Sequence, residues 1–372
     1  MSEPSLLLAG GGTAGHVNPM LALAAQVRER YPKVRLRALG TADGLEQQLV
    51  PAAGIELIEV PRVPLPRRPS MDVLRFPGRL RRAIGVADQA VAEADVLVGF
   101  GGYVATPGYL AARRARVPIV VHEQNARAGL ANRLGARFAH SVAVTFPGTA
   151  LPNATVVGLP LRPDIADLVA AREEDAAAAR ARSADTLGLD PGRRVLVVSG
   201  GSLGAVRLNQ AMTGAAARVL ETGTQVLHLT GIGKDEPVRR ALAQIADSSD
   251  YHVLPYLDAM QHALACADLM LCRAGAGTVC ELAALGIPAV YVPLPIGNGE
   301  QALNAAGVVE AGGGMLVDDD DLSADWLRSE LMPLLAEPAR LEQMATRAAA
   351  VGVRNGAQRL TDLVEAAAGW AA

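Results

Sequence analysis

The chain opens on Leu6-Leu7-Leu8-Ala9-Gly10-Gly11-Gly12-Thr13-Ala14-Gly15-His16 and repeats the design about half-way along, in Val195-Leu196-Val197-Val198-Ser199-Gly200-Gly201-Ser202-Leu203-Gly204. In each stretch an apolar run of strand length leads into glycines and then into a helical pattern. Backbone N–H groups and a helix N-terminus can face an anion at such a turn. A chain that builds this turn twice suggests two nucleotide-binding α/β domains that face a cleft.

Composition limits the classes of function. At 372 residues the chain suits two domains, each long enough to bury its own core. Hydrophobic residues make up 50% and charged residues 20%, which is typical of a globular protein rather than a disordered one. The net charge is −3 and aromatic residues make up 3%. We therefore expect no nucleic-acid partner, since both a basic surface and stacking platforms are lacking.

The cysteines and the apolar runs bear on the compartment. Cys266, Cys272 and Cys280 form no CxxC pair and are odd in number, which favours small buried thiols in a reducing compartment. The first residues lack the basic and apolar regions of a secretory signal, and no apolar run approaches the ~18 residues that span a bilayer. No His/Cys cluster has metal-ligand spacing. We expect a soluble, cytosolic protein without a bound metal.

Short aliphatic runs alternate with helical patterns along both halves, which predicts βαβ units and parallel sheets. The first two helices are expected at 19–30 and 42–49. A Pro-flanked stretch near 159–192 marks the boundary, so we place one domain at residues 1–160 and the second at 161–354. Residues 355–372 form a last helix whose apolar stripe needs a partner, and the first domain is one option. The stripe consists of Leu360, Leu363, Val364 and Ala367.

A third turn, Cys272-Arg273-Ala274-Gly275-Ala276-Gly277-Thr278-Val279-Cys280-Glu281, is the most informative. The amides of Ala276, Gly277 and Thr278 would open a helix and point at a diphosphate. Glu281 could accept both hydroxyls of a ribose, or form a capping box with Thr278. Arg273 could balance the diphosphate charge or form an ordinary salt bridge. Both alternatives stay open on the sequence alone.

Two further sites carry polar side chains at strand ends. His16, just past the first glycines, could take a proton from a hydroxyl nucleophile, bind a phosphate oxygen, or bond a loop carbonyl. His122-Glu123-Gln124-Asn125 follows an aliphatic strand, at the edge where open α/β sheets bind ligands. The alternative for these four residues is a solvated loop.

Residues 61–86 carry seven arginines against a single acid, Asp72, interleaved with apolar side chains. This profile is typical of a surface that lies on anionic lipid, although a solvated helix with an ordinary core face would share it. The run Asp318-Asp319-Asp320-Asp321 precedes a helix that Ser323 would cap, and we interpret it as a solvated loop.

Six stretches stand in one order along the chain: Gly11–Pro19, Gly101-Gly102-Tyr103, His122–Asn125, Gly200–Ala205, Arg273–Glu281 and Gln301-Ala302-Leu303-Asn304-Ala305. Together they resemble one family, the bacterial undecaprenyldiphospho-muramoylpentapeptide β-N-acetylglucosaminyltransferases of peptidoglycan synthesis, which convert lipid I to lipid II. The resemblance covers nearly the whole chain. It implies a GT-B fold, in which two Rossmann-like parallel-sheet domains face a cleft. It also implies inverting transfer of GlcNAc from UDP-GlcNAc to the C4 hydroxyl of MurNAc in undecaprenyl-diphosphate-MurNAc-pentapeptide, with no cofactor beyond the donor substrate.

The resemblance also assigns residues. Donor contacts fall on Thr13, Ala14, Gly15, Asn125, Arg162, Ser202, Leu257, Arg273, Ala276, Gly277, Thr278, Val279, Cys280, Glu281 and Gln301, with Leu257 near the uracil and Glu281 on the ribose. The acceptor diphosphate would meet the first glycine turn and the 101–103 turn. Two departures matter: Ala14 stands where many members carry glycine, and residues 295–300 replace a more polar stretch.

For the catalytic base we favour His16, with Glu123 as the second choice. The family's peripheral attachment to the cytoplasmic face of the membrane would fall on residues 61–86, and a cell-wall synthesis complex is an implied partner. The rivals are another UDP-sugar GT-B glycosyltransferase or a UDP-GlcNAc 2-epimerase with a soluble substrate. A dehydrogenase would want a ribose-binding acid about 20 residues beyond the first turn, and none stands out before Asp43.

Overall fold

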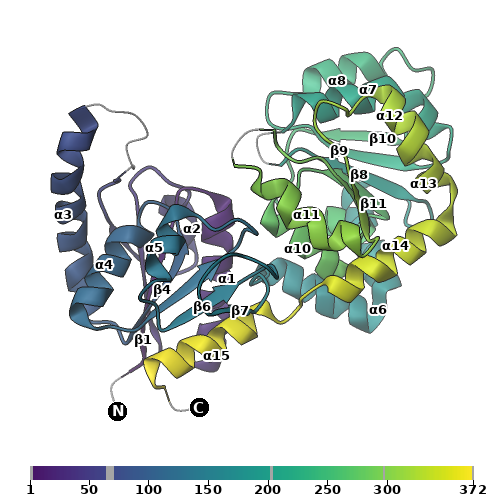
Figure 1. Cartoon of the computed structure of the whole chain (residues 1–372). Coiled ribbons are helices and arrows are strands. Elements are labelled where there is room, and N and C mark those ends of the chain that lie inside the picture. Colours follow the sequence, from purple (N-terminus) through teal and green to yellow (C-terminus); the bar gives the residue numbers. More distant parts are fainter. Residues whose placement is uncertain (1–2, 64–70, 202–203, 296–297, 371–372) are drawn as a thin grey trace. The chain divides into compact units, whose positions relative to one another are not determined.

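The computed structural model describes residues 3–63, 71–201, 204–295 and 298–370. The chain divides into two compact units, Met1–Pro163 with Asn355–Ala372, and Asp164–Arg354 (Figure 1). Each unit is a parallel sheet whose strands alternate with helices. The predicted fold class, two Rossmann-like α/β domains, is confirmed.

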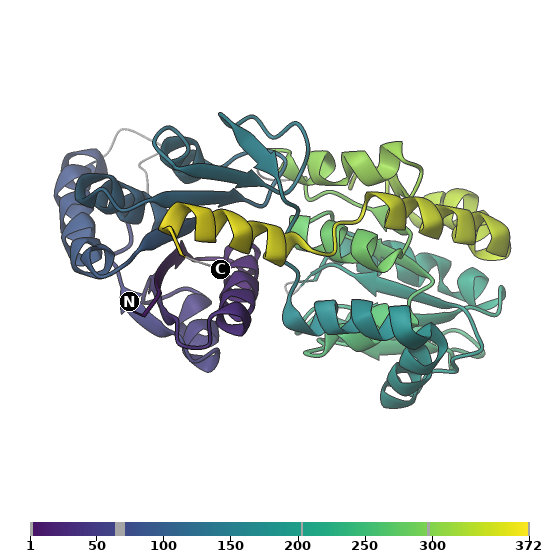
Figure 2. The ribbon, with the colours of Figure 1, turned by 90° about the horizontal axis from the view of Figure 1, so that it is seen from below.

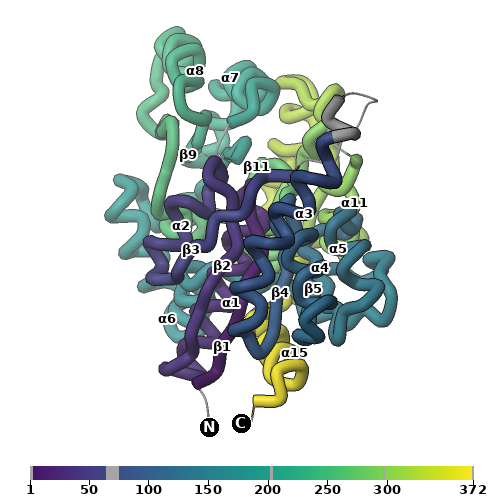
Figure 3. The backbone as a smooth tube through the Cα atoms, turned by 90° about the vertical axis from the view of Figure 1, so that its left-hand side faces the viewer, coloured from purple at the N-terminus to yellow at the C-terminus, as the bar shows by residue number. Residues whose placement is uncertain are grey.

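Unit 1 is built on a sheet that has seven strands among the described residues, in the order β3-β2-β1-β4-β5-β6-β7. Figure 3 labels the first five of them, β3 to β5 in this order. The strands are β1 (Ser5–Gly10), β2 (Arg35–Gly40), β3 (Glu56–Glu59), β4 (Val96–Gly101), β5 (Ile119–Glu123), β6 (Ser141–Val144) and β7 (Ala154–Val156). All neighbouring pairs are parallel, for example Leu6 opposite Leu36 and Val96.

Helices cover both faces of this sheet, which explains the aliphatic strands without polar alternation. They are α1 (Ala14–Arg30), α2 (Glu46–Ala52), α3 (Met71–Ala92), α4 (Ala105–Ala115), α5 (Leu130–Gly135) and α15 (Gly356–Ala368). Leu6 and Leu8 of β1 pack in one core with α1 and α15. Leu7 and Ala9, which point to the opposite face, pack in the other core with α3 and α4.

The last helix, α15, belongs to unit 1 although it follows unit 2 in the chain. Its stripe, Leu360, Val364 and Ala367, is buried in the same core as β1, and α15 lies beside α1 (Figure 2). The indole nitrogen of Trp370 donates to Asp95, and the same carboxylate oxygen accepts from the Ser5 amide, at 3.1 and 2.8 Å. Trp370 therefore fastens the end of the helix to the start of the first strand.

Unit 2 repeats the scheme with a sheet of six strands among its described residues, in the order β10-β9-β8-β11-β12-β13. The strands are β8 (Val195–Ser199), β9 (Gln225–Leu229), β10 (Tyr251–Leu254), β11 (Leu269–Cys272), β12 (Ala289–Tyr291) and β13 (Gly314–Leu316). All neighbouring pairs are again parallel.

The helices of unit 2 follow the same alternation. They are α6 (Pro163–Leu187), α7 (Val206–Leu220), α8 (Asp235–Leu242), α9 (Met260–Cys266), α10 (Ala276–Leu285), α11 (Glu300–Glu310), α12 (Ala324–Trp326), the π-helix Leu327–Leu331, α13 (Met332–Ala336) and α14 (Pro338–Val351). Leu196 and Val198 of β8 pack with α7 and α14 in one continuous core. The three cysteines are free, and Cys266 and Cys272 are buried.

Two predicted helix boundaries were wrong. Helix α1 begins at Ala14, not Pro19, because proline at that place removes only a hydrogen bond to the exposed Gly15 of the first turn. Helix α2 begins at Glu46, not Ala42, because residues 41–45 form a turn instead. The second difference has a consequence for the site, since it sets the position of the Glu46 carboxylate.

Candidate functional site

Both sheets have a topological switch point, a pair of neighbouring strands from which successive strands are added toward opposite edges of the sheet. In unit 1 it lies between β1 and β4, and in unit 2 between β8 and β11. Open α/β sheets bind ligands beyond the carboxyl ends of the strands at this place. The predicted glycine turns follow these four strands, so each unit has two of them at its switch point.

In unit 1 the turns after β1 and β4 touch through their backbones. A Cβ atom added at Gly102 would lie 2.6 Å from the Gly11 carbonyl oxygen, and one added at Gly101 would lie 3.2 Å from Nε2 of His16. Both glycines also have positive φ angles, 97° at Gly101 and 80° at Gly102. The structure therefore brings the His16 ring and the 101–103 turn together.

His16 lies in the first turns of α1, with its Nδ1 atom 2.9 Å from Oγ1 of Thr13. Thr13 is the N-cap residue, and its carbonyl accepts from the amides of His16 and Val17. Burial lowers the pKa of His16, while the Glu46 carboxylate and a hydrogen bond with the Gly11 backbone oppose that shift. A neutral imidazole near a strand end can accept a proton from a hydroxyl. Ala14 and Gly15, beside it, are exposed.

Glu46, the first residue of α2, contacts this turn and was not predicted from the sequence. Its side chain is fully buried, and Oε2 accepts from the Gly12 amide at 2.8 Å. Oε1 accepts from the amide and the hydroxyl of Thr41, at 2.9 and 2.8 Å. The available signal was a carboxylate just after the end of the second strand, the place where dinucleotide-binding folds keep their ribose acid. Here that acid binds the protein's own glycine turn.

Glu123, the second predicted base, holds a loop. Its Oε1 accepts from the Asn125 amide at 3.0 Å, and its Oε2 accepts from the Gly129 amide and from Nδ2 of Asn132, at 2.9 and 3.0 Å. Burial raises the pKa of Glu123, although these hydrogen bonds oppose the shift. Asn132 also donates to the His122 carbonyl and accepts from the buried Tyr109 hydroxyl. The 122–125 stretch therefore consists of the end of β5 and the first residues of the following loop. It is hydrogen-bonded and mostly buried, and is not a solvated loop.

In unit 2 the turn after β8 is tightly packed. Gly204 has a φ of 65°, and a Cβ atom there would lie 2.1 Å from the Thr230 carbonyl oxygen. Nζ of Lys234 donates to the Gly204 carbonyl at 3.3 Å, so a cation lies at this turn. The sequence analysis missed Lys234, although Gly231-Ile232-Gly233-Lys234 follows a strand and could have signalled it. Ser202, a predicted donor contact, lies outside the described residues.

The turn after β11 is open. Gly275 is the N-cap of α10, and a Cβ atom added at Gly275 or Gly277 would meet no atom of the described residues within 4 Å, its chain neighbours and helix backbone apart. The first intrahelical bond runs from the Val279 amide to the Gly275 carbonyl, so the three amides before it point out of the helix end. The alternative of a capping box between Thr278 and Glu281 was wrong, because the cap lies three residues earlier and makes no side-chain bond.

Other predicted donor contacts lie around this turn. The Val279 side chain is 1% exposed, so it can offer only its backbone. Cys280 and Glu281 are half-buried. Oε1 of Gln301 accepts from the Leu294 amide at 2.9 Å, and Nδ2 of the buried Asn304 donates to the Ala274 carbonyl at 3.3 Å. Helix α11 therefore holds the β11–α10 turn from one side.

Arg273 forms a salt bridge, which was the alternative to the predicted diphosphate contact. Its Nη1 donates to Asp319 at 2.5 Å and to the carbonyls of Val292 and Pro293, each at 3.2 Å. Asp319 also pairs with Arg207 of α7, at 3.6 Å. The interpretation of the aspartate run as a solvated loop was therefore wrong for Asp319, whose side chain is 11% exposed.

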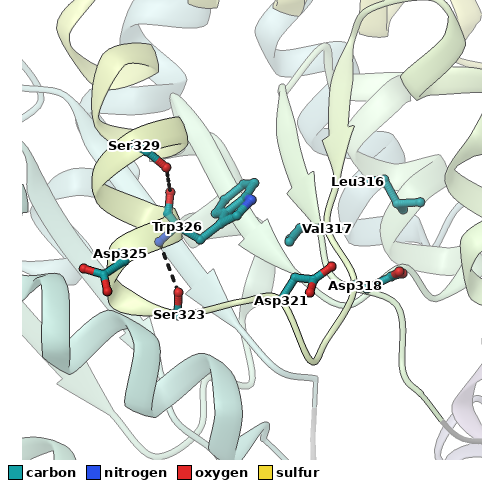
Figure 4. Close-up of a pocket in the computed structure, with 8 residues that line it drawn as sticks. All are labelled: Leu316, Val317, Asp318, Asp321, Ser323, Asp325, Trp326 and Ser329. Carbon is teal, nitrogen blue, oxygen red and sulfur yellow. Dashed lines mark hydrogen bonds between the residues drawn. The ribbon is translucent and has the colours of Figure 1, made fainter.

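A pocket lies between the end of β13 and α12 (Figure 4). Its lining residues are Leu316, Val317, Asp318, Asp321, Ser323, Asp325, Trp326 and Ser329, and no predicted donor contact of the described chain is among them. The expected cap is confirmed here, since the Ser323 hydroxyl accepts from the Trp326 amide at 3.1 Å.

Two further donor predictions lie at a distance along the chain from these turns. Leu257 follows β10 and is half-buried, and Arg162 lies at the end of the first part of unit 1, also half-buried. The described part of the chain contains no group of three or more His, Cys, Asp or Glu side chains placed to hold a metal ion. Nor does it contain a helix long and apolar enough to cross a bilayer.

The arginine-rich helix α3 shows its two faces clearly. Exposed are Arg75, Arg81 and Arg82, whereas Phe76, Leu80 and Ile84 pack partly buried against a core that includes α4. In the described part of this segment the apolar side chains therefore stabilise unit 1. Arg79, unlike the three exposed arginines, is half-buried. Arg67 and Arg68 lie outside the described residues.

Comparison with known proteins agrees with this geometry. Residues 6–144 match the glycosyltransferase family 28 N-terminal domain, and residues 195–360 match the C-terminal domain of that family. A relative from Paenarthrobacter aurescens, "UDP-N-acetylglucosamine--N-acetylmuramyl-(pentapeptide) pyrophosphoryl-undecaprenol N-acetylglucosamine transferase", is 54% identical and aligns over 98% of this chain and 96% of its own.

Two solved structures extend the comparison. The crystal structure of MurG from Acinetobacter baumannii superposes with a TM-score of 0.78 at 29% identity, over 98% of this chain and 99% of the other. A UDP-N-acetylglucosamine 2-epimerase from Listeria monocytogenes superposes at 0.67 with 15% identity, over 98% and 96%, which shows a shared fold alone. The chain belongs to glycosyltransferase family 28, among the pyrophosphoryl-undecaprenol N-acetylglucosamine transferases.

Proposed function

We propose that this protein transfers GlcNAc from UDP-GlcNAc to the C4 hydroxyl of MurNAc in undecaprenyl-diphosphate-MurNAc-pentapeptide, with inversion at the sugar C1 and release of UDP. The observation that carries the proposal is the open helix end at Gly275–Thr278, in a chain 54% identical to a transferase named for this reaction. The remaining steps assign roles to the residues of each unit.

Unit 2 binds the donor in this proposal. The outward amides of Ala276, Gly277 and Thr278 hold the diphosphate and stabilise its growing charge as UDP leaves. Lys234, at the neighbouring glycine turn, adds a positive charge. Arg273 is already paired with Asp319, so it holds the turn in place and leaves the diphosphate to the amides and Lys234. Glu281 binds the ribose hydroxyls.

Unit 1 supplies the base. With a hydrogen on Nδ1, His16 donates to Thr13 and keeps the lone pair of Nε2 for the acceptor. The C4 oxygen forms a bond to the sugar C1, the C1–O bond to UDP breaks with its electron pair, and the hydroxyl proton passes to Nε2. The absence of a side chain at Gly101 leaves room beside this atom. Glu123 is the weaker candidate because both its oxygens already accept hydrogen bonds.

The protein works at the cytoplasmic face of the membrane in this proposal, attached peripherally through residues 61–86. The outward arginines of α3 support an electrostatic contact with anionic lipid, worth about 1 kcal/mol for each side chain near the surface. The described apolar side chains of α3 pack against the core of unit 1, so they stabilise the fold and do not insert into the lipid. The expected complex with other enzymes of cell-wall synthesis would assemble at the same face of the membrane.

The direct test is incubation of the purified protein with UDP-GlcNAc and a lipid I analogue. UDP release that needs both substrates supports the proposal. Release that depends on a soluble sugar acceptor instead would favour another UDP-sugar glycosyltransferase. Conversion of UDP-GlcNAc to its 2-epimer with no acceptor present would favour the epimerase.

A further inference from the structure

The Glu46 carboxylate lies in a cradle of glycines from three separate segments. A Cβ atom added at Gly11, Gly40 or Gly44 would lie 2.4, 2.6 or 2.1 Å from an atom of the Glu46 side chain. These glycines belong to the turn after β1, the end of β2 and the turn before α2. The fold therefore leaves space for a side chain of this length at this position, and for little else.

Glu46 is ionised in this cradle. Burial opposes ionisation, but hydrogen bonds from the amides of Gly12 and Thr41 hold the pKa of the carboxyl below its ordinary value. The carboxylate satisfies the Gly12 amide, which therefore does not serve an outside phosphate. A fixed negative charge lies under the first glycine turn, where the sequence alone suggested a positive field.

We propose that Glu46 is a positioning residue for His16: it fixes the first glycine turn through Gly12, and its negative charge stabilises the imidazolium that forms when His16 takes the acceptor proton. This proposal rests on the proposed role of His16 as base. In Ser-His-Asp hydrolases a buried carboxylate stabilises the imidazolium of the catalytic histidine through a direct hydrogen bond. Here the carboxylate would act through the glycine turn and through space, without a direct bond to the ring.

The surroundings of His16 single out Glu46 as the charge that acts on it. Thr13 and Gly11 lie on its own turn, Gly101 lies on the β4 turn, and the amide of Asn132 on α5 lies near Gly101; all are neutral. Among the described residues, Glu46 on α2 is the one ionised group that shifts the pKa of His16, and it raises that pKa against the effect of burial.

The test compares Glu46→Gln with a matched control, Thr41→Val. The first removes the charge and leaves a single oxygen to accept from either Gly12 or Thr41, and the second removes one hydrogen bond to Glu46 while keeping its charge. Histidine-labelled protein is titrated by NMR, and the His16 signal is assigned from its loss in His16→Asn. With six histidines in the chain the spectrum is simple. The pH profile of kcat/KM with UDP-GlcNAc and a lipid I analogue is measured in parallel.

We expect Glu46→Gln to lower the pKa of His16, to move the acid limb of kcat/KM to lower pH, and to reduce turnover on the plateau by about tenfold or more, because the weaker base transfers a proton less readily. Thr41→Val should leave the pKa of His16 in place. An unchanged pKa of His16 in Glu46→Gln would overturn the proposal.

The design separates this proposal from the proposed function. If the pKa of His16 falls in Glu46→Gln but the activity profile does not follow, Glu46 acts on His16 as inferred, while the role of His16 as base fails. If Glu46→Gln does not fold, as judged by circular dichroism, the same titration in Glu46→Met decides. That variant keeps the length of the side chain and removes its charge, so a lowered pKa of His16 supports the proposal and an unchanged one contradicts it.

Discussion

The two switch points of this molecule have the same topology, but the charged side chains at their glycine turns have opposite signs. In unit 1 the glycine turn after β1 encloses its own carboxylate, Glu46, and carries an imidazole, His16. In unit 2 the turn after β11 is open, with Gly275 and Gly277 facing empty space and Lys234 at the neighbouring turn. A glycine-rich turn after a parallel strand therefore does not by itself indicate a phosphate-binding site. A side chain of the protein can accept the hydrogen bond that a backbone amide of the turn would otherwise donate to phosphate.

Replacing His16 with Ala should have the largest effect. Turnover should fall by ~10²-fold or more, since the proton acceptor is lost. The affinity for UDP should remain nearly intact because the donor is bound by unit 2. Steady-state kinetics and calorimetric titration with UDP check the two halves of the prediction. His140→Ala is a matched control, because this histidine is exposed just before β6 and its ring lies in hydrogen-bonding distance of the neighbouring Ser141 hydroxyl. Unchanged turnover in His16→Ala would remove His16 from the base role.

Charge reversal on α3 should show whether unit 1, rather than unit 2, makes the contact with the membrane. Arg75, Arg79 and Arg82, each changed to Glu, should weaken binding to anionic vesicles by about 10²-fold or more, at about 1 kcal/mol for each basic residue lost. Vesicle co-sedimentation at low and high salt measures this, because the contact should also weaken with salt.

The control for that experiment carries the same charge change on unit 2. Arg218, Arg240 and Arg340 are exposed, and their change to Glu should leave vesicle binding nearly as it was. Equal loss in both triple variants would mean that net charge, and not the α3 surface, governs the contact.

Filling the open turn of unit 2 should weaken donor binding. Gly277→Val adds a side chain to the empty space at the helix end, so UDP affinity should fall by at least about tenfold, equivalent to ~1.4 kcal/mol. The thermal stability should change little, because the described residues place no atom within 4 Å of the added Cβ position, apart from chain neighbours and the backbone of the same helix. Gly307→Ala in α11 is the control, since it too has open space. Calorimetry with UDP that shows wild-type affinity for Gly277→Val would reject this turn as the diphosphate site.

Removing the Glu123 carboxylate should affect stability more than acid–base chemistry. Glu123→Ala leaves the amides of Asn125 and Gly129 and the Asn132 side chain without their acceptor, and each buried unpaired group costs about 1–3 kcal/mol. Denaturant unfolding should show the loss. The acid limb of the pH–activity profile should stay in place, and its disappearance would transfer the base role from His16 to Glu123.

The sequence allowed the two parallel sheets and the strand ends of the site to be predicted, because aliphatic runs and glycine turns are local signals. It also indicated that α15 needs a partner, and Leu360 and Val364 are buried against unit 1. Contacts between distant segments carried no local signal. Glu46 meets Gly12 across 34 residues, and Arg273 meets Asp319 across 46. The same gap explains the wrong capping box, since Thr278 and Glu281 fit the pattern while the backbone places the cap at Gly275.

The central claim is that the diphosphate binds the open turn of unit 2 and not the occupied turn of unit 1. A crystal structure of the protein with UDP tests it most directly. We expect the pyrophosphate oxygens within hydrogen-bonding distance of the amides of Ala276, Gly277 and Thr278, with Glu46 still bonded to Gly12. A pyrophosphate seated on Gly10–Gly12, with Glu46 displaced, would contradict the account.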